Sequence, residues 1–144
     1  MRHLRDRNRR RAGRPHLPLA RSVRDPVVSE LSVTFTREQI AAYAEASGDR
    51  NPIHLDGDFA RSVGLPGIIA HGMLQMGIMG VVAAEAAGGP ANLRRLLCRF
   101  AGMVEPGDRV SFSAGPSGPG RLDLRAVNQR GEPVLTKASA EFGR

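Results

Sequence analysis

The chain has 144 residues, which is enough for one domain with a substantial apolar core. Its single cysteine, Cys98, excludes a disulfide framework within the chain and fits a reducing, cytoplasmic environment. Residues 1–25 hold nine arginines and two acidic residues, whereas residues 26–144 hold twelve basic and twelve acidic residues. The net charge of +7 therefore belongs to the N-terminal segment. We expect neither a secretory signal nor a membrane span.

Residues 1–24 are polar and rich in arginine and proline, without apolar periodicity. We expect them to form a disordered extension, and residues 25–144 to form the single folded domain. An arginine tract can bind phosphate backbones, but this one carries no interleaved aromatic residues on which bases could stack. The sequence therefore does not favour nucleic-acid binding.

The folded part opens with a strand over residues 27–35, where Leu31, Val33 and Phe35 alternate with polar residues. A helix is expected over residues 37–46, because Thr36 and Gln39 fit a capping box. A short helix or turn follows at residues 58–63, after Asp56.

The stretch between these two helices cannot continue the first one. Pro52 lacks an N–H group and disfavours the α conformation at Asn51, so we expect Gly48 to end the helix. The resulting rigid turn fixes the directions in which Asp49 and His54 point. A carboxylate and an imidazole held in this way are suited to general acid–base chemistry.

A long apolar helix is expected over residues 72–87, starting directly after His71. Its apolar residues surround the helix axis, which is typical of a fully buried helix. We expect Met73, Met76 and Met79 to fill the core rather than to line an acyl tunnel. The free N–H groups at Gly72, where no Cβ blocks the backbone, make an oxyanion site plausible.

The rest of the chain reads as strands at residues 93–104, 109–114, 121–128 and 134–142, with a loop at 116–120. The last two strands are joined by a turn over residues 130–133. We expect Arg94, Arg95 and Arg99 to form a solvated strand face, although they could also meet the phosphates of a carrier. The pattern predicts an α+β domain in which an antiparallel meander wraps around the long buried helix.

Three stretches, YAEASGDRNPIHLD, GLPGIIAHGMLQMG and FAGMVEPGD, resemble the MaoC-like (R)-specific enoyl thioester hydratases, a family with the hot-dog fold. Within that family the chain is most similar to the catalytic subunits of mycobacterial-type (3R)-hydroxyacyl-thioester dehydratases. The resemblance covers about residues 32–142. It implies a single hot-dog domain and a hydro-lyase that hydrates trans-2-enoyl thioesters, without a cofactor.

Transferred to this sequence, the resemblance implies that Asp49 and His54 are the catalytic pair. The backbone N–H of Gly72 would receive the thioester oxygen. Asn51, His71 and Met73 complete the expected oxyanion and substrate side, with Asn51 bracing the turn and His71 shaping the loop. Some family members carry a serine on the central helix where this chain has Gly80, so any hydrogen bond of that hydroxyl is missing here.

Two other functions remain open: a hot-dog acyl-thioester hydrolase, and a non-catalytic partner subunit of a heterodimeric dehydratase. The expected substrate is an acyl-CoA or acyl-carrier-protein thioester. The expected working unit is a homodimer, or a heterodimer with a related hot-dog subunit, joined along the edge strand at residues 93–104. No metal is expected, since no ligand spacing typical of a metal site occurs.

Overall fold

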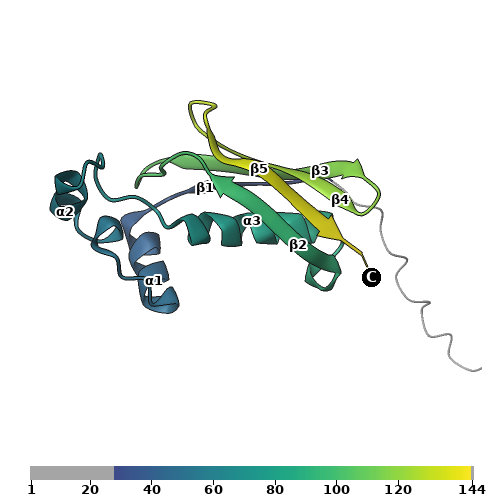
Figure 1. The fold of residues 1–144 in the computed structure, drawn as a ribbon, viewed down its shortest axis with the longest axis horizontal. Helices are drawn as coiled ribbons and strands as arrows, with labels where there is room; N and C mark the ends of the chain where they lie inside the picture. Colours follow the sequence, from purple (N-terminus) through teal and green to yellow (C-terminus); the bar gives the residue numbers. More distant parts are fainter. Residues whose placement is uncertain (1–27, 144) are drawn as a thin grey trace, which may run out of the picture.

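The computed structural model describes residues 28–143, so the prediction of disorder in residues 1–24 lies outside the described part. A five-stranded antiparallel sheet covers one long helix, and the helices within residues 37–62 lie together at one end (Figure 1). The elements are β1 (Ser29–Thr34), α1 (Arg37–Ser47), η1 (Pro52–His54), α2 (Gly57–Ser62), α3 (Gly72–Ala86), η2 (Pro90–Asn92), β2 (Leu93–Phe100), β3 (Arg109–Gly118), β4 (Arg121–Asn128) and β5 (Pro133–Phe142). None of the helices in this part of the chain is long and apolar enough to cross a membrane.

The strands lie in the order β1-β3-β4-β5-β2. The predicted meander is therefore correct for β3, β4 and β5 but wrong for β2, which pairs with β5 at the far edge. Alternation along a strand indicates which face is buried, and it carries no information about which strand lies beside it.

Two strand boundaries differ from the prediction by four residues each. β2 ends at Phe100 rather than at residue 104, because the N–H groups of Ala101 and Gly102 both bond to the carbonyl of Val134 as the chain leaves the sheet. β3 continues through Gly118, which shortens the predicted loop to a tight turn before β4.

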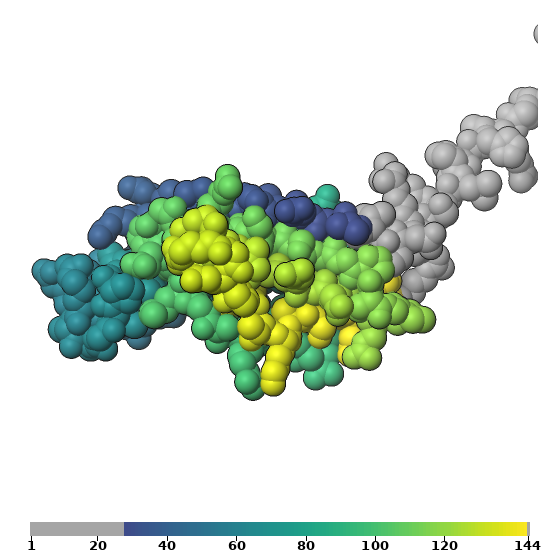
Figure 2. All heavy atoms as spheres, turned by 90° about the horizontal axis from the view of Figure 1, so that it is seen from above, coloured from purple at the N-terminus to yellow at the C-terminus, as the bar shows by residue number. Residues whose placement is uncertain are grey.

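The core lies between the inner face of the sheet and α3. Along β4, residues Leu122, Leu124 and Ala126 point inward and are buried, while the residues between them are exposed. They meet the buried side of α3, which includes Met79 and Val82. Figure 2 looks onto the opposite face of the sheet, where β3, β4 and β5 form the outer surface.

α3 is buried on one side only, which corrects the prediction of a fully buried helix. Met73 and Val81 are 56% and 63% exposed, and they lie on the side of the helix away from the sheet. Of the three methionines expected in the core, Met79 is buried, Met76 is half-buried and Met73 is outside it. In Figure 1 no described element covers this outer side of α3.

α1 begins as predicted, with Thr36 accepting a hydrogen bond from the Gln39 N–H at 3.1 Å. The reciprocal half of the capping box is not formed, since the Gln39 side-chain oxygen is buried without a partner in the described residues. α1 ends at Gly48, whose φ of 77° is the left-handed conformation that glycine adopts at low cost. The next residue is Asp49, the first member of the predicted catalytic pair.

Candidate active site

The turn after α1 is held by its own side chains. The Asp49 Oδ1 atom accepts a hydrogen bond from the Asn51 N–H at 3.3 Å, and the Asn51 Oδ1 atom accepts one from the Ile53 N–H at 3.2 Å. Asn51 thereby caps η1, where Pro52 occupies the first position without a lost donor. Asn51 therefore braces the turn, as the sequence predicted.

His54 ends this short helix and is only 8% exposed. Its Nδ1 atom lies 2.7 Å from the carbonyl oxygen of Ile69, and the Ile69 N–H donates to the carbonyl of Ile53 at 3.2 Å. A carbonyl only accepts hydrogen bonds, so Nδ1 carries the proton, and in the neutral ring Nε2 then presents its lone pair. The segment before α3 thus fixes both the position and the tautomer of His54.

Asp49 and His54 face each other across a short gap. The Asp49 Oδ2 atom lies 4.0 Å from the His54 Nε2 atom, which is too far for a direct hydrogen bond. The carboxylate is more than half exposed, whereas the imidazole is almost completely buried. Asp49 Oδ2 and His54 Nε2 are thus two hydrogen-bond acceptors on opposite sides of one gap, the first on an exposed side chain and the second on a buried one.

His71 contacts both members of this pair. Its Nε2 atom lies 2.9 Å from the backbone carbonyl of Asp49, and its ring stacks on that of His54 with 3.7 Å between the centroids. The Tyr43 ring contacts its edge, at 4.8 Å between centroids. His71 is 1% exposed, and its Nδ1 atom is buried without a partner among the described residues.

α3 begins at Gly72, and its N-cap His71 makes no side-chain capping bond within the described residues. The first N–H groups of the helix therefore lack an intrahelical acceptor and carry the positive end of the helix dipole. The space that a Cβ at Gly72 would fill is taken by the Phe100 ring, with carbon atoms 3.0–3.1 Å away. Packing of Phe100 thus leaves little room for a side chain at this position, and the ring would have to shift to admit one.

The predicted residues separate into two groups. Asp49, His54 and His71 place ligand atoms within 4.8 Å of one another, and Gly72 follows directly in the chain. Met73 does not turn into the core and lies on the open side of α3. The strand arginines Arg94, Arg95 and Arg99 are exposed, as expected of a solvated face.

The carboxylate and the two imidazoles could suggest a metal centre, but their arrangement fits one poorly. A metal binds an imidazole nitrogen in the plane of the ring, at about 2.0–2.1 Å for zinc. The His54 and His71 rings are nearly parallel, with 24° between their planes, and lie one above the other. An ion between them would lie out of both planes. Both Nδ1 of His54 and Nε2 of His71 are already bonded to backbone carbonyls.

Sequence reasoning missed three contributors to this site. Ile69 acts through its carbonyl, which leaves no signal in a side-chain pattern. Tyr43 is the only tyrosine of the chain and lies six residues before Asp49, a signal that could have been weighed. Phe100 lies within the predicted strand over residues 93–104, and its contact with Gly72 depends on where β2 ends.

Comparisons with known proteins bear on the family and the fold of this chain. The sequence model of a family described as "MaoC like domain" matches residues 19–137. The peroxisomal hydratase-dehydrogenase-epimerase of Neurospora crassa is 36% identical over 125 residues, covering 87% of this chain and 13% of that protein. The 3-hydroxyacyl-thioester dehydratase Y of Mycobacterium tuberculosis is 40% identical over 93 residues, covering 62% of this chain and 32% of that protein. This chain therefore spans less than a third of the length of either curated relative.

Among solved structures, the R-hydratase PhaJ1 of Pseudomonas aeruginosa superposes with a TM-score of 0.71 at 28% identity. The match covers 83% of this chain and 80% of that one. The prediction of an α+β hot-dog domain, with an antiparallel sheet around a central helix, is confirmed by this likeness and by the sheet described above.

Proposed function

This chain belongs to the MaoC-like hydratase and dehydratase family, and from that premise we propose that it is a hydro-lyase acting on acyl thioesters. It adds water to trans-2-enoyl thioesters to give (3R)-3-hydroxyacyl thioesters and catalyses the reverse dehydration. We infer the (R) configuration of the product from the likeness to an R-hydratase. We infer the thioester substrate class from the relative named as a thioester dehydratase.

The observation that carries the proposal is the 4.0 Å separation of Asp49 Oδ2 and His54 Nε2. One water molecule that donates both of its hydrogens, at about 2.8 Å each, spans two acceptors at this distance with an angle of about 90° at its oxygen. The pair then acts as a general base: it takes a proton from the water while the water oxygen bonds to C3 of the substrate.

The same step pushes electrons onto the thioester oxygen, which becomes enolate-like. The Gly72 N–H at the start of α3, supported by the helix dipole, stabilises that negative charge. C2 then receives a proton from the dyad, and the enolate returns to a thioester. The product gains one water in total, so no cofactor or redox step is needed.

The carrier of the acyl group is CoA or an acyl-carrier protein. Both present the same pantetheine thioester to the dyad. The exposed arginines of β2 offer a positive surface to phosphate or to an acidic carrier, which is compatible with either.

The working unit that we propose is a dimer, either of two identical chains or with a related subunit. β2 lies at a sheet edge with its Leu97 and Phe100 side chains partly exposed, and the outer side of α3 exposes Met73 and Val81. An open edge beside an apolar helix side is a surface that proteins usually cover. Light scattering should give the mass of a dimer, and a monodisperse, fully active monomer would exclude it.

The function is tested by incubating the purified chain with crotonyl-CoA and following two signals together. Hydration removes the conjugated enoyl absorbance without releasing a thiol, whereas a thioester hydrolase releases free CoA. Loss of absorbance alone, with a (3R)-3-hydroxy product, is the expected result. Thiol release would point to the hydrolase. No reaction, even after co-expression with a related subunit, would contradict catalysis by this chain.

A further inference from the structure

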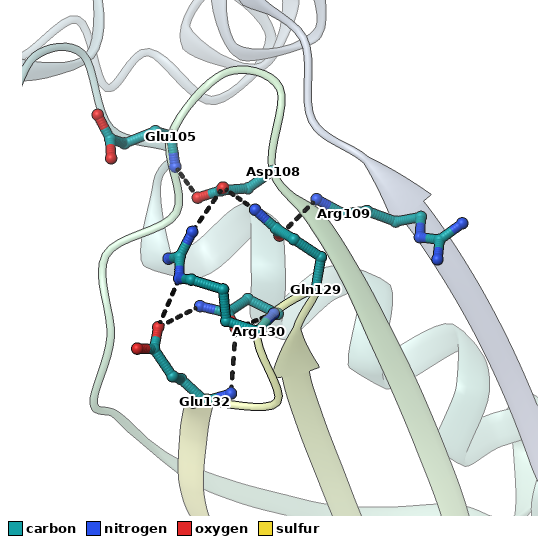
Figure 3. A network of polar contacts seen from close by, with 7 residues as sticks. Glu105, Asp108, Arg109, Gln129, Arg130 and Glu132 are labelled. Carbon is teal, nitrogen blue, oxygen red and sulfur yellow. Dashed lines mark hydrogen bonds and ion pairs between the residues drawn. The ribbon is translucent and has the colours of Figure 1, made fainter.

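A second polar cluster lies at the same end of the sheet, around the buried side chain of Asp108, which is 10% exposed (Figure 3). Its Oδ2 atom accepts a hydrogen bond from the Glu105 N–H at 2.9 Å, and its Oδ1 atom accepts one from Gln129 Nε2 at 2.7 Å. The bond from Glu105 closes the tight turn over residues 104–108, which we call the 104–108 turn, and the bond from Gln129 reaches it from outside. One carboxylate thus ties this turn to the hairpin between β4 and β5.

The hairpin is itself well fixed, so it is a firm support for the 104–108 turn. The Asn128 side-chain oxygen accepts hydrogen bonds from the N–H groups of Arg130 and Glu132, at 2.9 and 3.0 Å. Gln129 is held at its other end, because its Oε1 atom accepts a hydrogen bond from the Arg109 N–H at 3.1 Å.

The 104–108 turn contacts the chain segments that lead to both catalytic candidates. On one side, the Phe35 N–H donates to the Asp108 carbonyl at 2.9 Å and the Gly107 N–H donates to the Phe35 carbonyl at 2.8 Å. Phe35 is completely buried and directly precedes Thr36, the cap of α1, whose far end leads into Asp49. Phe35, which begins the segment that leads through α1 to Asp49, therefore both donates a hydrogen bond to the 104–108 turn and accepts one from it.

On the other side, the carbonyl of Val104 accepts a hydrogen bond from the Ala70 N–H at 2.7 Å. Ala70 lies between Ile69, whose carbonyl holds His54 Nδ1, and His71, whose ring supports His54. Val104 is completely buried, so this bond is shielded from water. The 104–108 turn thus joins the support of Asp49 to the support of His54.

We propose that Asp108 is a positioning residue of the reaction, which sets the gap between Asp49 and His54 through the 104–108 turn. This inference rests on the proposed function of the dyad. A water held by two acceptors responds to their spacing, and a misplacement of about 1 Å at a reacting group can cost about 10²-fold in rate.

The carboxylate is required because both of its oxygens accept hydrogen bonds at the same time. In Asp108→Asn, one oxygen becomes an NH₂ group, which meets a donor from either Glu105 or Gln129. One of the two bonds is therefore lost, and the 104–108 turn loosens while its backbone bonds to Phe35 remain.

The test compares Asp108→Asn with Glu132→Gln as a matched control. Both changes remove one negative charge from the same cluster. Within the described residues the Glu132 side chain has no direct hydrogen bond or ion pair to the 104–108 turn, and it is linked to Asp108 only through Arg130, which pairs with both carboxylates. Two readouts are taken on the purified full-length chain: kcat and KM for crotonyl-CoA, and the ¹⁵N chemical shifts of the His54 ring. The shifts report whether Nδ1 alone carries the proton, a property that overall stability does not change.

We expect Asp108→Asn to lower kcat by about tenfold or more with KM nearly unchanged. The two His54 ¹⁵N shifts should also move closer together as the Ile69 acceptor is displaced. Glu132→Gln should keep kcat within about twofold and leave the shifts unchanged. An Asp108→Asn variant with normal kcat, or with wild-type His54 shifts, would overturn the proposal, and so would equal losses in both variants.

If Asp108→Asn does not fold, Gln129→Met removes one of the two donors to the carboxylate and should produce the same changes at smaller size. A Gln129→Met variant with wild-type kcat and shifts would then overturn the proposal. A wild-type chain without hydratase activity would refute the proposed function, while the His54 shifts would still decide whether Asp108 positions that ring.

Discussion

The two polar clusters of this molecule use similar side chains in opposite ways. The first cluster, which we call the hairpin cluster, lies around Asp108 and Glu132. Both oxygens of Asp108 have donors, and Glu132 Oε2 accepts hydrogen bonds from Asn128 and from Arg130. The second cluster, which we call the dyad cluster, consists of Asp49, His54 and His71. There, Asp49 Oδ2 and His54 Nε2 face each other as two acceptors without a donor among the described residues. Buried polar groups are normally paired, and the pairing of the buried Asp108 carboxylate stabilises the fold. The Asp49 carboxylate is more than half exposed, so the two acceptors of the dyad are open to a substrate or a water molecule.

The largest expected effect comes from removing either acceptor of the dyad. His54→Ala and Asp49→Asn should each lower kcat/KM for crotonyl-CoA by about 10²–10⁴-fold, the usual contribution of a general acid–base group. Circular dichroism and the urea midpoint should change little for Asp49→Asn, whose side chain is mostly exposed. Glu132→Gln serves as the charge-matched control. Near-normal turnover in either dyad variant would mean that the open acceptors have another purpose.

A smaller effect is expected where Gly72 meets Phe100. A Cβ at position 72 would come within 3.0 Å of the Phe100 ring, so Gly72→Ala should destabilise the fold by about 1 kcal/mol through overpacking. Phe100→Leu in the same chain should restore most of that stability, as measured by urea unfolding. If activity returns with stability, the glycine is needed only for packing. If Gly72→Ala alone unfolds like the wild type, the contact does not constrain this position.

The Glu132 carboxylate of the hairpin cluster should make the free energy of unfolding depend on pH. Hydrogen bonds from Asn128 and Arg130 lower the pKa of the Glu132 carboxyl below its usual value of 4.5. Its contribution is therefore present above that value and is lost as the pH falls through the lowered pKa. Thermal unfolding should show Glu132→Gln slightly less stable than the wild type at pH 7, because the group is exposed and screened. The difference should vanish in acid, and a constant difference would contradict this explanation.

A modest gain in stability is expected at Gly80, in the middle of α3, the helix that starts beside Asp49 and His54. A Cβ there would meet no atom within 4 Å, and its φ is not positive. Gly80→Ala should therefore stabilise the chain by about 0.5–1 kcal/mol through helix propensity. Urea unfolding measures this change. A loss of stability would show that this side of α3 is closely covered by a partner.

Local features of the fold were predictable from the sequence because their causes are local. Thr36 caps α1, Gly48 ends it, and Pro52 forces the turn that carries Asp49 and His54. The β4–β5 hairpin followed from its turn residues in the same way. Each of these depends on backbone chemistry within a few residues.

Long-range features escaped prediction for the opposite reason. The pairing of β2 with β5 and the open side of α3 depend on which surfaces meet in three dimensions, and apolar composition does not specify this. Asp108 and Gln129 look like ordinary turn residues until the fold brings them together. The role of Ile69 is carried by its backbone, which no side-chain pattern reveals.

The central claim is that Asp49 and His54 act as one unit on one water molecule. The most direct test is the rate of the double variant Asp49→Asn/His54→Ala, measured against both single variants with crotonyl-CoA. Groups that act as a unit show strongly non-additive losses, so the double variant should be no more than a few-fold slower than the slower single variant. Losses that multiply would show that the two residues contribute independently, and they would contradict the account.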